Sequence, residues 1–324
     1  MMSEINIVVN ATAGKGMRID KYCSLQTGSI SRSRLKNGAL TILVNGQKAK
    51  MSRNVRVSDR ITISWEDPIP EQLVAEDIPL EILFEDENVT VINKEQGMVT
   101  HPAAGNWSGT LVHALLWHWK QNAPEGNYRP GIVHRLDKDT SGVIITARNL
   151  DTEAWLQTQF RSRKVHKVYA AILKGVPKAL EGEIRTQILR DPKNRKRYTW
   201  TNIPDRGRSS HTTYRVIRVY GHYSLVLFRL HTGRTHQLRV HSKFLGCPIL
   251  GDPVYGKKDS LFPEASLMLH ARSLRICLPG KDAPNLFEAP VPLRFKKILK
   301  ILKETFPTRK RPLLYLRPEG GFLS

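Results

Sequence analysis

Several features that define common protein classes are missing from this sequence of 324 residues. It has three cysteines, Cys23, Cys247 and Cys277, which lie far apart, so neither a disulfide framework nor a thiolate zinc site is expected. It has no apolar run long enough to span a membrane. The first residues lack the basic start, apolar centre and cleavage site of a secretory signal. We therefore expect a globular, cytoplasmic protein with no membrane partner.

The signatures of several enzyme classes are absent as well. The GKG at 14–16 is not a phosphate-binding loop, no GxGxxG follows a predicted strand, and Ser141 lies in TSG rather than GxSxG. His231, His236 and His241 recur every five residues, a spacing that aligns neither on one helix face nor on one side of a strand. A metal site built from these three is therefore not expected. We predict no metal ion and no organic cofactor.

Acidic residues are scarce relative to basic ones. The chain has 29 Asp and Glu against 51 Lys and Arg, which gives a net charge of +22 and a pI near 10.1. Such an excess favours a polyanionic partner, with nucleic acid first and an anionic membrane a distant second. At 40% hydrophobic residues the composition is that of a folded protein, and the length suits two domains.

A proline-rich acidic segment divides the chain. Residues 66–79, EDPIPEQLVAEDIP, separate two parts with different patterns, and we predict an interdomain linker there. We take residues 1–15 as an N-terminal extension. Residues 18–26 and 31–37 are predicted to form two short helices, followed by short β-strands.

The part before the linker is basic. Its pattern, RxDKY followed by SRSRLKNGAL and VNG over residues 16–65, resembles the S4 RNA-binding domain. That resemblance implies a small domain that presents cations to structured RNA. The cations we expect to contact RNA there are Arg18, Arg32, Arg34 and Lys36. A merely solvated basic surface is the alternative.

The part after the linker is rich in predicted strands. Runs such as VTVIN, VIITA and SLVLFRLH predict strands, while helices are expected near 110–119, 151–161, 236–244 and 295–306. Asp151 is a candidate N-cap of the second helix. Because strands outnumber helices and do not alternate regularly with them, we predict an α+β fold with a mixed, largely antiparallel sheet.

One segment is a candidate for chemistry. Residues 131–142, GIVHRLDKDTSG, place Asp137 in a polar turn between two apolar runs. Loops at strand ends often carry reactive groups, but an aspartate in a turn more often caps backbone amides. The residues by themselves leave both interpretations open.

A series of motifs then matches a known family. HRLD at 134–137 followed by TSG at 140–142 resembles the signature of the RluA family of RNA pseudouridine synthases. Further blocks follow the family order: HPAAGN at 101–106, KVYAAILKG at 167–175, TGRTHQLRVH at 232–241, GDPVYG at 251–256 and LHA at 269–271. The S4-like part and HPAAGN are most similar to the D type, which acts on the ribosomal large subunit. Lys94-Glu95 stands where the family usually has Lys-Pro, which we expect to alter a loop rather than remove a reactive group.

The resemblance implies specific roles. Residues 80–324 would form a catalytic domain with a central cleft, in which Asp137 is the catalytic carboxylate and Arg239 is the cation that pairs with it. Tyr169 would stack on the target base, and Arg135 would insert where the flipped uridine was. The implied reaction is isomerisation of uridine to pseudouridine in structured RNA, above all 23S ribosomal RNA.

A second basic segment is predicted to contact RNA. Residues 190–208 carry seven Lys and Arg against two acids, with Tyr198 and Trp200 interleaved, and aromatic side chains can stack on unpaired bases. The cations singled out are Lys193, Arg195, Lys196 and Arg197.

Three other functions remain open on the sequence. The protein could be a non-catalytic RNA-binding or ribosome-assembly factor, an RNA hydrolase that uses Asp137 and a histidine, or a synthase that acts on transfer RNA. No obligate protein partner is indicated.

Overall fold

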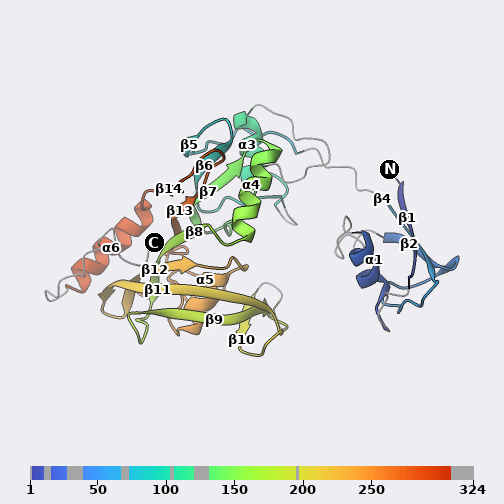
Figure 1. Cartoon of the computed structure of the whole chain (residues 1–324). Coiled ribbons are helices and arrows are strands. Elements are labelled where there is room, and N and C mark those ends of the chain that lie inside the picture. Colours follow the sequence, from blue (N-terminus) through green and yellow to red (C-terminus); the bar gives the residue numbers. More distant parts are fainter. Residues whose placement is uncertain are drawn as a thin grey trace. The chain divides into compact units, whose positions relative to one another are not determined.

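The chain forms two compact units, Met1–Gln72 and Leu73–Ser324, so the boundary lies inside the acidic 66–79 segment (Figure 1). The computed structural model describes residues 2–10, 16–27, 39–66, 73–102, 106–119, 131–194 and 197–307. Across these ranges, the helices are too short or too polar to cross a membrane.

The first unit contains a four-stranded antiparallel sheet in the order β1-β4-β2-β3. Its elements are β1 (Met2–Val8), α1 (Ile19–Thr27), β2 (Ala39–Val44), β3 (Gln47–Lys48) and β4 (Arg60–Glu66). Asn45 and Gly46 both have positive φ, 53° and 78°, and form the tight turn between β2 and β3. Helix α1 corresponds to the first of the two helices predicted from the sequence.

The N-terminal segment differs from the expectation. Residues 2–8, which we set apart as part of an extension, form the edge strand β1 and pair with β4 along their whole length. The reason is a short apolar alternation, Ile5 and Ile7, that packs against Ile61 and Ile63 in the core of this unit. The second predicted helix, at 31–37, lies outside the described residues.

The second unit contains a ten-stranded sheet in the order β10-β9-β11-β12-β8-β13-β7-β6-β5, with β14 paired to β13. The strands are β5 (Ile82–Glu85), β6 (Val89–Lys94), β7 (Ser141–Ala147), β8 (His166–Lys174), β9 (Glu181–Arg190), β10 (Tyr198–Thr201), β11 (Arg208–Tyr220), β12 (Tyr223–Leu230), β13 (Leu269–Ile276) and β14 (Asn285–Glu288). Among these described strands, only β7 and β13 pair in parallel. The predicted α+β fold with a mixed, largely antiparallel sheet is confirmed.

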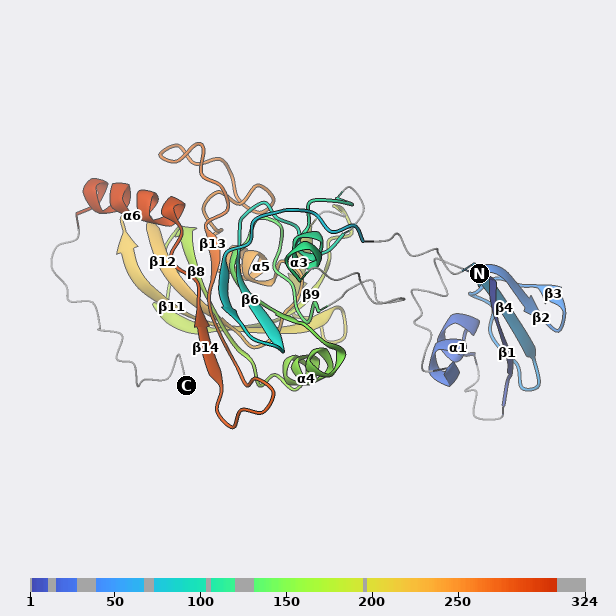
Figure 2. The ribbon, with the colours of Figure 1, turned by 90° about the horizontal axis from the view of Figure 1, so that it is seen from above.

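Four helices accompany this sheet, seen from above in Figure 2. They are α3 (Leu111–Trp119), α4 (Leu150–Arg161), α5 (Gln237–Phe244) and α6 (Leu293–Thr305). All four were expected from the sequence, but the predicted cap of α4 was wrong. Asn149 is the N-cap, because its side chain accepts the backbone N–H of Thr152 at 2.9 Å. Asp151 lies within the first turn, where its negative charge interacts favourably with the positive end of the helix dipole.

Strand β7 is buried along its whole length and positions the segment that precedes it. Ile144 packs in one hydrophobic cluster, whereas Val143 and Ile145 pack in another. Gly142, with φ of 116°, is required where β7 approaches β13, because a Cβ atom there would collide with the carbonyl group of Ala271. The HRLD segment therefore leads directly into a rigid strand.

Candidate active site

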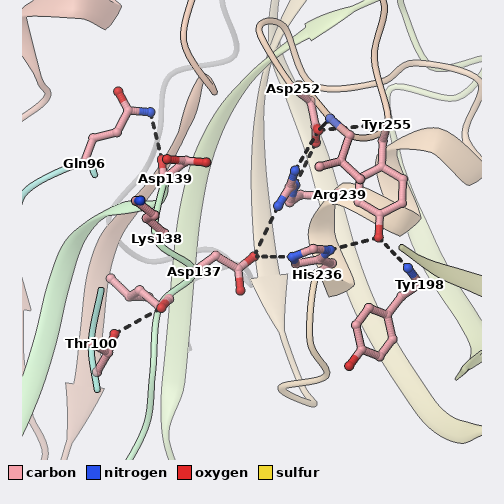
Figure 3. A network of polar contacts seen from close by, with 12 residues as sticks. Gln96, Thr100, Asp137, Lys138, Asp139, Tyr198, His236, Arg239, Asp252 and Tyr255 are labelled. Carbon is pink, nitrogen blue, oxygen red and sulfur yellow. Dashed lines mark hydrogen bonds and ion pairs between the residues drawn. The ribbon is translucent and has the colours of Figure 1, made fainter. Parts of the chain in front are cut away.

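The segment that carries Asp137 is fixed by contacts on both sides. Thr100 Oγ1 donates to the carbonyl oxygen of Leu136 at 3.1 Å (Figure 3). His134 Nε2 accepts the backbone N–H of Ile145 at 3.1 Å. Burial and the nearby charge of Lys167 lower the pKa of His134 to about 3, so the ring is neutral and can accept this hydrogen bond.

Lys94 is buried next to this segment. Its Nζ donates to the carbonyl oxygens of Glu95, Met98 and Lys138 at 2.7, 2.8 and 3.2 Å. Burial lowers the pKa of Lys94 to about 8, against the opposing effect of Asp137. Lys94 thus ties the turn after β6 to the Asp137 segment. A proline at position 95 would offer the same carbonyl oxygen as Glu95, so the departure from Lys-Pro is compatible with this contact.

The Asp137 carboxylate faces the side chains of Arg239 and His236, which come from α5 and the residue before it (Figure 3). Its Oδ2 lies 3.9 Å from Arg239 Nη1 and 4.0 Å from His236 Nε2. The side chain is 22% exposed. These distances are longer than hydrogen bonds, but the Arg239 guanidinium is close enough to attract the carboxylate electrostatically. Asp137 is therefore an accessible carboxylate in an electropositive setting.

Arg239 is held by a second carboxylate. Its Nε and Nη2 each donate to Asp252 at 2.8 Å, and the two side chains are 4% and 0% exposed. Burial by itself lowers the pKa of the Arg239 guanidinium. The hydrogen bonds and the negative charge of Asp252 have the larger, opposite effect, so the pKa is raised overall. The structure therefore rules out a surface cation at 239. The sequence led us to expect Asp137 as the partner of Arg239, but Asp252 lies closer to the guanidinium than Asp137 does.

His236 connects Asp137 to a tyrosine (Figure 3). Tyr255 Oη accepts the backbone N–H of Tyr198 at 2.8 Å and lies 2.9 Å from His236 Nδ1. The Tyr255 hydroxyl can therefore donate its proton in a hydrogen bond to His236 Nδ1. In the neutral ring the single N–H is then on Nε2, which faces Asp137. Burial lowers the pKa of His236 although Asp137 opposes the shift. The residue adopts a left-handed conformation with φ of 56°.

Tyr169 and Asp137 line the same cavity. Its volume is about 490 Å³, and Arg135 and Arg239 also line it. Tyr169 lies on β8 and is 7% exposed. Burial and the charge of Asp137 both raise the pKa of Tyr169, so its hydroxyl stays protonated at neutral pH. The structure thus brings together the four residues predicted for catalysis and base flipping.

Other predicted RNA contacts are not at this cavity. Lys193 and Arg197 lie in the connection between β9 and β10 and are not among its lining residues. Arg18 belongs to the first unit, where it is 49% exposed and pairs with Asp20 at 3.1 Å. Five more predicted contacts lie outside the described residues, namely Arg32, Arg34, Lys36, Arg195 and Lys196.

The aromatic residues of the 190–208 segment have ring partners within the protein. Trp200 packs edge-on against Phe244 of α5 at 5.7 Å, and Tyr198 lies 5.6 Å from the ring of His236. Both are partly buried against the cluster that contains Tyr255. These contacts cover part of each ring, and stacking of the exposed part on unpaired bases stays a prediction.

Sequence reasoning missed His236, Asp252 and Tyr255 as site residues. The motifs TGRTHQLRVH and GDPVYG contained them, but nothing in their spacing indicates that residues 252 and 255 fold against α5. The three regularly spaced histidines have separate environments. His231 stacks on His211, His236 faces Asp137, and His241 is buried among hydroxyl groups.

Comparison with known proteins identifies the family. Residues 88–243 match the RNA pseudouridylate synthase family. Ribosomal large subunit pseudouridine synthase D of Borreliella burgdorferi is 42% identical over 288 residues, which cover 86% of this chain and 87% of that protein. The protein of the same name from Zymomonas mobilis is 37% identical over 89% of this chain and 94% of its own. The solved structure of human RNA pseudouridylate synthase domain containing 4 is 28% identical with a TM-score of 0.54, covering 69% of this chain and 93% of that one. The resemblance of the HRLD and TSG motifs is confirmed, and the chain belongs to the RluA family of RNA pseudouridine synthases.

Proposed function

We propose that this synthase isomerises uridine in the cavity lined by Asp137, and that Asp137 is its catalytic carboxylate. One observation carries the proposal: Asp137 is the single acidic side chain among the described residues that line the cavity. The reaction breaks the N1–C1′ bond, turns the uracil and joins C5 to C1′, while C5 loses its hydrogen as a proton and N1 takes up a proton. A carboxylate can serve it by attack on the sugar or base or by removing a proton from the sugar.

The surroundings of Asp137 support this role. Arg239 Nη1 at 3.9 Å and His236 Nε2 at 4.0 Å lie beside the carboxylate oxygen and give it an electropositive setting. Arg239 is held in place by Asp252, so its charge is available without movement of the helix. Replacing Asp137 by asparagine tests the proposal, as set out in the Discussion.

The uridine must leave its stack to reach this cavity, at a cost of a few kcal/mol. Arg135 is exposed and lines the cavity two residues before Asp137. We infer that its planar guanidinium fills the space that the flipped uridine leaves, because such a group stacks well on neighbouring bases.

Tyr169→Phe should leave RNA binding intact and stall product formation at a late step. The ring remains to contact the base, but the hydroxyl, which burial and Asp137 keep protonated, is lost as a proton carrier for C5. Single-turnover kinetics should show RNA bound and base detached but little pseudouridine. Tyr214→Phe is the matched control, since Tyr214 is a buried tyrosine outside the cavity. Full product formation by the Tyr169 variant would confine this residue to packing.

We propose large-subunit ribosomal RNA, 23S in bacteria, as the substrate and the cytoplasm as the location. Two relatives that cover most of the chain are named for the ribosomal large subunit, and this supports the proposal. Transfer RNA is the alternative substrate. Position-by-position mapping of pseudouridine in cellular RNA distinguishes the two.

We further propose that the first unit is an S4-type RNA-binding domain that positions the substrate. Within 15–60 it has eleven Lys and Arg and two acids. Deleting residues 1–72 should weaken RNA binding without abolishing catalysis at high enzyme concentration. The salt slope of binding should fall by about 0.7–0.9 for each RNA phosphate that the first unit neutralises. Unchanged affinity and slope in a filter-binding titration would make this basic face a solvated surface.

A further inference from the structure

The cavity around Asp137 has an excess of positive charge that the proposed chemistry does not use. Six Arg and Lys line it against the single acid Asp137. Arg239 is held by Asp252, and Arg135 is assigned to base flipping. The other four come from the end of α4, from β8 and from the loop before α5, and they are Arg161, Arg163, Lys167 and Arg234.

Lys167 is the most unusual of these cations. It lies on β8 two residues before Tyr169, so both side chains point to the same face of the strand. Its side chain is half-buried, with Nζ 5.7 Å from the centre of the Phe160 ring. A Cβ atom built on Gly233 would lie 3.7 Å from this Nζ. No acidic side chain pairs with Lys167 within the described ranges.

Arg163 and Arg234 add charge to the same wall. Gly233, next to the Lys167 ammonium, directly precedes Arg234. Burial lowers the pKa of Arg234, and the like charges of Arg208 and Arg163 lower it further. Neither Arg163 nor Arg234 has an acidic partner in the part of the chain that the structure describes. Like charges gathered without counter-ions are costly in the free protein, and such costs are concentrated at functional sites.

We propose that Lys167, Arg163 and Arg234 bind one phosphodiester group of the RNA strand beside the target uridine. This proposal rests on the proposed function, because it needs the uridine to enter this cavity. Lys167 and Tyr169 are about 7 Å apart along β8, so a nucleotide whose base contacts Tyr169 brings its backbone toward Lys167. Phosphate oxygens accept charge-assisted hydrogen bonds from both ammonium and guanidinium groups. Gly233 leaves room for the backbone of the RNA to approach.

Removing one phosphate charge at a time tests the site. The probe is a stem-loop that contains a uridine which the enzyme modifies, with an uncharged methylphosphonate at single positions around it. At one flanking position the neutral linkage should weaken binding by the wild-type full-length protein about tenfold. Lys167→Met should weaken binding of unmodified RNA to a similar extent. The two changes combined should be no worse than either alone, because they remove the same interaction.

Two further proteins sharpen this measurement. Arg234→Gln should show the same non-additivity at the same position. Lys258→Gln, which removes an exposed lysine paired with Glu264 outside the cavity, should lose affinity additively or not at all. Additive losses for Lys167→Met at every flanking phosphate would overturn the proposal. The readout is a dissociation constant, so it stays interpretable even if Asp137 proves not to be catalytic, which turnover reports separately.

The pH dependence gives a second readout that a packing role would not produce. Burial lowers the pKa of Lys167 to about 8. A lysine is charged below its pKa, so wild-type affinity should fall as the pH rises from 7 to 9, and Lys167→Met should lose this dependence.

Two histidines line the cavity with Lys167 but titrate below this pH range, because the pKa values of His134 and His231 are lowered to about 3 and about 4. Lys94, whose pKa is also lowered to about 8, is not among the residues that line the cavity and is present in both proteins, so the comparison with Lys167→Met isolates Lys167. Lys167→Met should also unfold at an unchanged or higher temperature, since it removes a half-buried charge that lacks an acidic partner among the described residues. If Lys167→Met is less stable to heat and wild-type binding does not depend on pH, Lys167 serves packing and the proposed phosphate site is wrong.

Discussion

Asp137→Asn should abolish pseudouridine formation, with turnover lower by about four orders of magnitude or more, while folding and RNA binding persist. The substitution keeps the shape of the side chain, and the turn is held through the backbone, where Thr140 N–H donates to the Asp137 carbonyl at 3.0 Å. Only the negative charge and its nucleophilic or basic oxygen are removed. Release of tritium from C5-labelled uridine in RNA measures the reaction directly, because C5 must lose its hydrogen.

The neighbouring carboxylate is the matched control for this variant. Asp139 lies two residues away but does not line the cavity. Asp139→Asn should therefore keep most of the activity, and both variants should bind RNA like the wild type. Near wild-type tritium release by Asp137→Asn would remove this residue from the mechanism.

Arg239→Met should lower both activity and stability. The methionine cannot neutralise Asp252, which is 0% exposed and would remain as an unpaired buried carboxylate. Breaking such a pair costs about 3–5 kcal/mol of unfolding free energy. Asp137 also loses the positive charge of the guanidinium at 3.9 Å. Denaturant unfolding and single-turnover kinetics report the two effects separately.

A double variant separates structure from chemistry at this position. Arg239→Met with Asp252→Asn removes both buried charges, and asparagine can still accept the N–H groups of Val254 and Tyr255 that Asp252 accepts at 2.8 and 2.9 Å. Stability should largely return, whereas turnover should not. Arg185→Met, which breaks an exposed pair with Glu183, should leave stability close to that of the wild type. Recovery of activity in the double variant would show that Asp137 does not need the Arg239 charge.

Much of the fold was predictable because its elements have strong local patterns. The apolar stripe in α3 predicted a helix, and the continuous apolar run in β7 predicted a strand. The edge strand β1 was missed because its alternation is short and its pairing partner, β4, lies more than fifty residues away. The cap of α4 was misplaced by two residues because asparagine and aspartate both favour that position, and only the backbone geometry decides between them.

The site was predictable where its residues share one compact motif. Asp137 and Arg135 lie two residues apart in HRLD, and the resemblance of this motif to a known family, rather than the residues by themselves, indicated their roles. Asp252 and Tyr255 could not be placed, since their contacts with Arg239 and His236 depend on how two segments of the chain pack. Lys167 was noted only as the first residue of the KVYAAILKG block. Its significance is its position in the cavity wall, half-buried and without an acidic partner among the described residues, which only the three-dimensional structure shows.

The most direct test of the central claim is a map of pseudouridine in ribosomal RNA at single-nucleotide resolution. The cells to compare are those that lack this protein and those that carry either the wild type or Asp137→Asn in its place. We predict that specific large-subunit sites lose pseudouridine without the protein, regain it with the wild type and fail to regain it with Asp137→Asn, at equal protein levels. Restoration of those sites by the Asp137→Asn protein would contradict the assignment of Asp137 as the catalytic carboxylate.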